Sequence, residues 1–240
     1  MNNNMSKKKL AVLSGAGVSA ESGFSTFRDN DGYWGRYDPM EVASAEGWEK
    51  DRKLVLDFYN DLRAQLKDAK PNKAHLLIAG LEKDYDVSVI TQNVDNLHER
   101  AGSTKVIHLH GELTKVRPEH GAYDRDYSES EVFDIGYDAI HIGDKAPDGE
   151  QLRPHIVWFG EAVPKIEKAM DIVSESDIML IIGTSLSVYP AAGLYRYAKA
   201  GIPIYIIDPK DVPVRDPRIV HIRDIASSGM EKFRKILENG

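Results

Sequence analysis

The sequence predicts an α/β fold, a doubly wound parallel sheet of the Rossmann type that carries a smaller inserted module. Short apolar runs alternate with helical segments over most of the 240 residues, enough for one sizeable domain. A glycine-rich turn follows the first apolar run. Residues 114–153 interrupt the alternation with charges, glycines and scattered aromatics. Together these observations favour a parallel sheet interrupted by a separate small unit.

The strands are predicted from short apolar runs that end in small or polar residues. The first covers residues 10–14 and leads into a tight turn. Further strands are expected over 87–91, 106–109, 178–182 and 202–207.

The helices are predicted from apolar residues at helical spacing and from proline at the first helical position. Over 48–68 an apolar residue recurs every four positions, from Leu54 through Phe58 and Leu62 to Leu66. Other helices are expected to open over 18–23 and to cover 71–82, 164–174 and 190–200. Residues 24–40 have no clean period and are expected to form a long functional loop.

The composition excludes several classes of protein. Hydrophobic residues make up 42% and charged residues 29%, which is ordinary for a soluble globular chain. We expect a cytoplasmic location and no membrane partner, because no apolar run approaches the roughly 20 residues that span a bilayer and the N-terminus is polar. A net charge of −7 argues against a nucleic-acid partner. The absence of cysteine excludes disulfides, thiol nucleophiles and cysteine zinc sites.

The turn after the first strand fits the G-x-G-x-x-G/A pattern of dinucleotide sites, with Gly15, Ala16 and Gly17 at its start. Small residues let the backbone approach a pyrophosphate, and a helix N-terminus supplies N–H donors. A tight turn without a ligand is the alternative. The loop that follows carries Phe27 and Arg28 where a dehydrogenase would continue into a helix and a second strand. This departure favours chemistry on the dinucleotide itself over hydride transfer from it.

Polar residues follow the other strands, at the carboxyl ends where a doubly wound sheet binds its ligand. His108 and His110 share a face by alternation, and His110 beside a glycine is the better candidate for an exposed base. The remaining candidates at strand ends are Gln92, Asn93, Asp95, Gly183, Thr184, Ser185 and Asp208. Helix capping by Asn93 or Asp95 and a turn at Asp208 are the structural alternatives.

Five motifs in order resemble the sirtuin family, in its bacterial form. They are GAGVSAESGFSTFR at 15–28, TQNVDNLHERAG at 91–102, HLHGEL at 108–113, RPHIVWFGE at 153–161 and GTSLSVYPAAGL at 183–194. The resemblance covers nearly the whole chain except 114–152. It implies an NAD-dependent protein-lysine deacylase, most simply a deacetylase, that releases nicotinamide, free lysine and O-acyl-ADP-ribose. Acyl-lysine proteins would be its partners.

The resemblance also assigns roles to residues. Asn93 and His110 are catalytic, and His110 is the general base. The cofactor-binding set for NAD is Gly15, Ala16, Gly17, Phe27, Arg28, Gln92, Asn93, Asp95, Gly183, Thr184, Ser185, Asp208 and Ile225. The acyl-lysine set is Tyr59, Leu62, Val157, Phe159, Gly160 and Glu161. Residues 1–30, 72–113 and 154–240 would form the NAD-binding domain, 31–71 the helical part of a small domain with a lid loop, and 114–153 a module that replaces the zinc ribbon.

The chain departs from the family pattern in three places. Pro118 stands where the first zinc cysteine is expected, and His120 and His141 lack the sequence spacing of metal ligands, so no metal is expected. Relatives that remove acidic acyl groups carry Tyr-x-x-Arg, but Leu62 follows Tyr59 at that spacing. We expect Leu62 to pack in the tunnel or core and Arg63 to be solvated. Ser25 replaces a usual proline in the lid.

Three other functions stay open at this point. One is transfer of ADP-ribose or hydrolysis of NAD on the same fold, which acyl-peptide dependence of nicotinamide release would distinguish. A silent NAD-binding module is the second, against which the presence of His110, Asn93 and Asp95 counts. A hydride-transferring dehydrogenase is the third.

Overall fold

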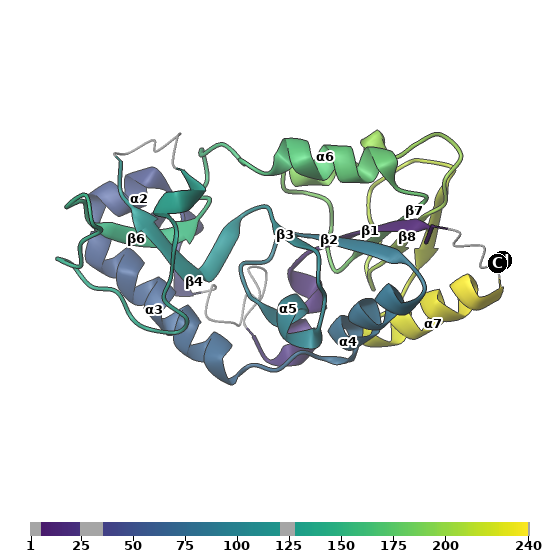
Figure 1. Cartoon of the computed structure of the whole chain (residues 1–240), viewed down its shortest axis with the longest axis horizontal. Helices are drawn as coiled ribbons and strands as arrows, with labels where there is room; N and C mark the ends of the chain where they lie inside the picture. The colour runs from purple at the N-terminus through teal and green to yellow at the C-terminus, as the bar shows by residue number, and fades with distance from the viewer. Residues whose placement is uncertain (1–5, 25–35, 121–127, 240) are drawn as a thin grey trace.

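In a computed structural model, which describes residues 6–24, 36–120 and 128–239, the chain contains two units with separate sheets. Figure 1 shows the larger unit around β1, β2, β7 and β8, with α6 along one side and α4 and α7 along the other. The smaller unit, with α2, α3, β4 and β6, lies at the opposite end of the molecule. Within the described ranges, each helix is too short or too polar to cross a bilayer.

The larger sheet has six parallel strands in the order β3-β2-β1-β7-β8-β9. They are β1 (Lys9–Ser14), β2 (Asp86–Thr91), β3 (Val106–His108), β7 (Ile178–Ile182), β8 (Ile204–Ile207) and β9 (Ile219–Ile222). The chain builds outward from β1 to β3 and then continues on the other side of β1, so the order reverses between β1 and β7. The predicted doubly wound parallel sheet is confirmed, with β9 as a strand that the apolar runs did not predict.

Both faces of this sheet are buried, which explains why its strands read as continuous apolar runs. Leu10 and Val12 of β1 pack on one face with α4 (Lys73–Gly80) and α7 (Ala226–Asn239). Ala11 and Leu13 pack on the other face with α6 (Ile166–Glu175) and η6 (Ala191–Tyr197). The alternation of side chains along β1 therefore builds two cores, one on each side of the sheet.

The smaller unit packs helices against a three-stranded antiparallel sheet of order β5-β4-β6. Its elements are α1 (Pro39–Val42), α2 (Ala45–Lys50), α3 (Arg52–Asp68), β4 (Gly111–Pro118), β5 (Phe133–Asp134) and β6 (Leu152–Ile156). Its core contains Trp48, Leu62, Leu113 and Trp158. The helix predicted over 48–68 is interrupted at Asp51, because this side chain accepts a hydrogen bond from the Leu54 N–H and caps α3.

Two predicted helices are 3₁₀ segments instead. After the glycine turn the chain forms η1 (Ala16–Val18) and η2 (Ala20–Ser22), and Gly23 ends this stretch with φ of 71°. The segment predicted over 190–200 forms η6, whose interior contains Gly193, a weak helix former. The glycine turn therefore leads into two short 3₁₀ turns, and not into a regular helix.

Candidate active site

The site is built on the point where the strand order reverses, and glycines bring two strand ends into contact there. The Gly17 N–H donates to the Gly183 oxygen over 2.8 Å. A Cβ atom on Gly17 would lie 2.8 Å from the Gly183 Cα, and one on Gly183, where φ is 64°, would lie 2.3 Å from the Val18 nitrogen. Both positions therefore require glycine. These glycines let the turn after β1 pack directly against the end of β7, at the edge where a doubly wound sheet binds its ligand.

The segment after β2 is tied to this turn through Ser19. The Asn93 amide donates to the Ser19 hydroxyl over 3.1 Å, and that hydroxyl donates to the Asp95 carboxylate over 2.9 Å. The second Asp95 oxygen accepts from the Leu97 N–H over 3.0 Å, at the start of α5 (Leu97–Ala101). Asn93 and Asp95 are buried, and burial raises the pKa of Asp95. The predicted candidates Asn93 and Asp95 thus form one buried polar network.

His110 follows β3 and lies against the same segment. Its Nδ1 is 3.0 Å from the backbone oxygen of Gln92, an atom that can only accept. In the neutral ring the proton therefore sits on Nδ1 and Nε2 carries the free lone pair. Burial lowers the pKa of His110, against a smaller opposite effect of the Gln92 hydrogen bond. The neutral form, a proton acceptor at Nε2, is favoured near neutrality.

The end of β7 completes this edge of the sheet. The Gln92 side chain donates to the Thr184 hydroxyl over 3.0 Å, which joins the segments after β2 and β7. The Ser185 hydroxyl donates to that of Ser187 over 3.2 Å. Asp208, at the end of β8, accepts from the Lys210 N–H over 2.8 Å, the turn role that the sequence also allowed. Ile225 is 51% exposed and adjoins the start of α7.

The segment after β6 is held between the two units. The Val157 N–H donates to the His110 oxygen over 3.0 Å, and the Phe159 N–H donates to the Ala43 oxygen over 2.9 Å. The Phe159 side chain is 41% exposed, and Gly160 follows with φ of 87°. The exposed Phe159 side chain is therefore two residues from Val157, whose N–H donates to the backbone of the predicted base His110.

Buried arginines fix the shape of that segment. The Glu161 carboxylate is 2.8 Å from Arg153 and 3.7 Å from Arg117, and it accepts from the Trp158 N–H over 2.8 Å. The Arg153 guanidinium stacks 3.4 Å from the centre of the Trp158 ring. The Glu161 side chain is therefore engaged inside the protein. The sequence motifs did not predict this network of ion pairs.

The two predicted acyl-binding residues on α3 are both buried. The Trp158 Nε1 donates to the Tyr59 hydroxyl over 3.1 Å, and burial raises the pKa of Tyr59 above its usual range. Leu62 is 1% exposed and packs in the core of the smaller unit, one of the two positions predicted for it.

The prediction that Arg63 is solvated is wrong. Its side chain is fully buried, donating from Nε to the Leu113 oxygen over 2.7 Å and from Nη1 to the Asn60 side chain over 2.5 Å. Asn60 in turn pairs with both backbone groups of Ile140, at 2.8 and 3.0 Å. Burial lowers the pKa of Arg63 to about 10. Arg63 and Asn60 thus fasten the inserted module to α3, which is why the side chain is inside.

The module also brings together residues that are far apart in sequence. Ligand atoms of His120, Glu131 and Asp148 lie within 4.8 Å of one another, and His120 is 3.4 Å from Glu131. Sequence spacing gave no sign of this cluster. All three side chains are at least partly exposed, and exposed groups of this kind often lie together without a metal.

Two predicted cofactor residues, Phe27 and Arg28, and the altered lid residue Ser25 lie outside the described residues.

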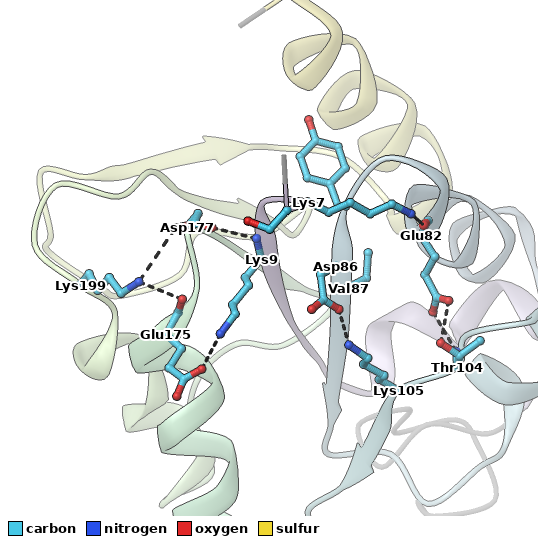
Figure 2. Close-up of a pocket in the computed structure, with 12 residues that line it drawn as sticks. Lys7, Lys9, Glu82, Asp86, Val87, Thr104, Lys105, Glu175, Asp177 and Lys199 are labelled. Atoms are coloured by element: carbon cyan, nitrogen blue, oxygen red, sulfur yellow. Dashed lines mark hydrogen bonds and ion pairs between the residues drawn. The ribbon is translucent and has the colours of Figure 1, made fainter. Parts of the chain in front are cut away.

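A depression of about 640 Å³ lies at the opposite, amino edge of the sheet (Figure 2). Its charges pair among themselves: Lys9 with Glu175 over 2.5 Å, and Lys105 with Asp86. This depression therefore lies away from the polar network at the carboxyl edge, and its charged groups already have partners.

Comparisons with known proteins find relatives that match nearly the whole chain. The sequence model of the Sir2 family matches residues 15–190. A protein of Bacteroides thetaiotaomicron named NAD-dependent protein deacylase is 54% identical over 96% of this chain and 98% of its own length. A Helicobacter pylori protein of the same name is 55% identical over 85% of each chain. The solved structure of a Sir2 homologue in complex with NAD superposes with a TM-score of 0.84 at 38% identity, covering 97% of this chain and 90% of that one.

Proposed function

The chain belongs to the Sir2, or sirtuin, family, and from that premise we infer that it is an NAD-dependent protein-lysine deacylase. The observation that carries this function is His110, whose proton-accepting Nε2 is set by the Gln92 oxygen beside the Asn93–Ser19–Asp95 network. A base positioned at a dinucleotide site suits chemistry on the ribose of NAD. A silent binding module needs no such base, and the relatives named NAD-dependent protein deacylase favour acyl chemistry over hydride transfer.

NAD fits the residues at this edge of the sheet. We propose that the pyrophosphate lies beside the turn of Gly15, Ala16 and Gly17, which packs against Gly183 at the edge where a doubly wound sheet binds its ligand. We propose that Thr184, Ser185, Asp208 and Ile225 hold the adenosine part. Gln92, Asn93 and Asp95 would line the nicotinamide pocket. Phe27 and Arg28 would cover the nicotinamide ribose.

NAD supplies the ribose that receives the acyl group and the nicotinamide that leaves. Attack of the acyl oxygen on the ribose C1′ breaks the bond to nicotinamide. The buried amide of Asn93 and carboxylate of Asp95 stabilise the developing positive charge and exclude water from that carbon. His110 then takes a proton at Nε2 from a ribose hydroxyl, which attacks the acyl carbon. The bond between the acyl carbon and the lysine nitrogen then breaks, and the leaving amine takes up the proton that His110 received. Addition of water to the acyl carbon gives O-acyl-ADP-ribose beside the free lysine.

The acylated partner would bind along residues 157–161. An extended peptide adds to exposed backbone as a strand, so Val157, Phe159, Gly160 and Glu161 would contact it mainly through main-chain groups. The ion pairs of Glu161 with Arg153 and Arg117 hold this segment in one shape before the peptide arrives. A solved Sir2 structure at 27% identity and TM-score 0.78 contains a deacetylated p53 peptide together with 3'-O-acetyl ADP ribose.

We further propose that the preferred acyl group is acetyl or a longer neutral chain. An acidic acyl group buried in the protein needs a cationic partner, because an unpaired buried charge is costly. Leu62 offers none, and two nitrogens of the neighbouring Arg63 are already engaged with Leu113 and Asn60.

Three further proposals rest on the composition of the chain. They are that the protein binds no zinc, that it is located in the cytoplasm and that it has no nucleic-acid partner.

A panel of acylated lysine peptides incubated with NAD and read by mass spectrometry tests the function. We expect one free-lysine peptide, one nicotinamide and one acyl-ADP-ribose per turnover. Nicotinamide release that does not depend on the acyl peptide would instead establish an NAD glycohydrolase. Transfer of mass to an unacylated protein would establish an ADP-ribosyltransferase, and a growing reduced-nicotinamide absorbance a dehydrogenase.

A further inference from the structure

A second histidine at the end of β3 makes contacts that the proposed reaction does not use. His108 pairs in register with Thr91 of β2, and the residue is 4% exposed. Its Nδ1 lies 2.9 Å from the backbone oxygen of Asn93, and its Nε2 lies 2.8 Å from the Glu99 carboxylate. Asn93 is the residue whose side chain joins the Ser19 network. His108 therefore forms a hydrogen bond with the backbone of Asn93, a residue proposed to face nicotinamide.

The chemistry of the two partners defines the protonation of the ring. A backbone oxygen accepts only, and an ionised carboxylate also accepts only. Both ring nitrogens must then donate, which requires the imidazolium form. In His110 the Nδ1 atom alone is matched to such an acceptor, the Gln92 oxygen. Two histidines two residues apart thus hold successive carbonyls, one as a neutral base and the other as a cation.

The surroundings of His108 supply the negative charge that this form needs. Glu99 comes from α5, Glu112 from β4, and Asp95 from the segment after β2. Burial lowers the pKa of His108, but the hydrogen bond and charge of Glu99 outweigh it and raise the pKa above the usual value. Of the other charged or titratable groups nearby, His98 is buried with a lowered pKa, and Lys115 is 2.9 Å from Glu112.

We propose that His108 is a positioning residue for the nicotinamide end of the NAD site, holding the Asn93 carbonyl through Nδ1 while Glu99 keeps the ring doubly protonated. Asn93 is then fixed at three points: its N–H donates to the Thr91 hydroxyl over 3.0 Å, its side chain to Ser19, and its oxygen accepts from His108. This inference rests on the proposed function, which the peptide panel tests by itself with the unmodified enzyme.

Two isosteric substitutions separate the two bonds of His108. In His108→Asn the side-chain amide takes the place of Nδ1 and keeps the bond to Asn93, whereas in His108→Gln it takes the place of Nε2 and keeps the bond to Glu99. We expect the KM for NAD to rise about tenfold or more in His108→Gln and less than about threefold in His108→Asn. The dissociation constant of ADP-ribose, which lacks nicotinamide, should change less than about threefold in both.

The melting temperature of each variant shows whether the substitution destabilises the whole protein. If His108 had only a structural role, the KM for NAD would rise in proportion to the loss in melting temperature, whichever of the two bonds the variant keeps. Equal effects on the KM for NAD in the two variants, or an equal loss of ADP-ribose binding, would overturn the positioning role.

The protonation is tested directly by NMR titration of the His108 ring in the whole protein and in Glu99→Gln. A glutamine at this position keeps a hydrogen-bonding partner for the ring but removes the charge. We expect the His108 resonance to titrate above the ordinary pKa of about 6.5 in the unmodified protein and to shift to lower pH in Glu99→Gln. A ring that titrates at or below about 6.5 in the unmodified protein would overturn the role of Glu99.

Discussion

The Nδ1 atom of His110 lies 3.0 Å from the backbone oxygen of Gln92, and this contact decides which nitrogen of the ring is the base. Because the oxygen can only accept, the proton stays on Nδ1, and Nε2 is left to receive a proton from substrate. The contact also holds the ring against the segment proposed to bind nicotinamide.

Removing the base while keeping this contact gives the first prediction. In His110→Asn the amide can still donate to the Gln92 oxygen, but it cannot accept a proton as a base. We expect kcat for deacylation to fall by about 10²–10⁴-fold, with NAD affinity changed little, because the base acts after binding. Kinetics with an acetylated peptide and calorimetric titration of NAD measure the two quantities. Near-normal turnover in this variant would remove His110 from its assigned role.

The second prediction concerns the acid limb of activity. Burial lowers the pKa of His110, so the ring stays neutral and competent to somewhat lower pH than an exposed histidine. Deacylation should be constant near neutrality and fall on acidification with a midpoint below about 6.5. The profile of kcat against pH checks this. A midpoint above about 6.5 would mean that another group controls the step or that His110 is charged in the complex.

The parts of the fold that could be predicted depend on local sequence. The β7 run is apolar throughout, and the turn at Gly15 and Gly17 follows β1 directly, so neighbouring residues define both. Asn93, Asp95 and His110 follow strands, and the rule that ligands bind at the carboxyl ends of strands predicts that they lie at one edge of the sheet.

What could not be predicted depends on partners distant in the chain. Arg63 is buried because the Leu113 oxygen, 50 positions later, accepts from it, and no helical pattern carries that information. His108 appeared only as the poorer choice of base, since its partner Glu99 lies on another element. His120 meets Asp148 only after the module has folded.

The third prediction concerns metal. The module is held by Asn60 and Arg63 at one edge and by the Arg153–Glu161 ion pair at the other, so its fold has support without a metal. Metal analysis of the purified protein should find no stoichiometric zinc, and a chelator should leave the melting temperature unchanged. A one-to-one zinc content that is lost in His120→Ala would show instead that the cluster of His120, Glu131 and Asp148 is a metal site.

The fourth prediction concerns stability in acid. Burial lowers the pKa of His75 to about 4 and that of His155 to about 3, so both stay neutral in the folded protein. Unfolded histidine takes up a proton near a pH of about 6.5, so stability is greatest above that pH and is lost as the pH falls toward the folded-state values. Each ring should lower the free energy of unfolding by roughly 2 kcal/mol at about pH 5 relative to about pH 7.

Urea unfolding at several pH values measures this slope. His75→Gln removes one titrating group and can keep the capping box with Asn72, because glutamine suits that third helical position. The slope between roughly pH 6 and pH 5 should become shallower by about 1.4 kcal/mol per pH unit. His141→Gln, at an exposed position, is the matched control and should leave it unchanged. An unaltered slope in His75→Gln would show that this ring is protonated in the folded state.

The last prediction concerns acyl specificity. We expect the unmodified protein to prefer acetyl-lysine or a longer neutral acyl-lysine over succinyl-lysine, because Leu62 supplies no cation to a buried carboxylate. Leu62→Arg places a guanidinium beside Tyr59 and should raise the ratio of kcat/KM for succinyl over acetyl peptide by about tenfold or more. The ratio is internal to each variant, so a smaller folded fraction cancels from it.

Ala64→Arg adds the same charge at an exposed position of α3 and should leave the ratio unchanged. Arg63→Ala cannot serve as a neutral control, because it leaves the buried Leu113 oxygen without its donor and should lower the melting temperature. A native preference for succinyl-lysine would show that a cation reaches the acyl carboxylate despite Leu62. The unengaged Nη2 of Arg63 would then be the first group to examine, by Arg63→Lys, which keeps the charge but removes the fork of donors.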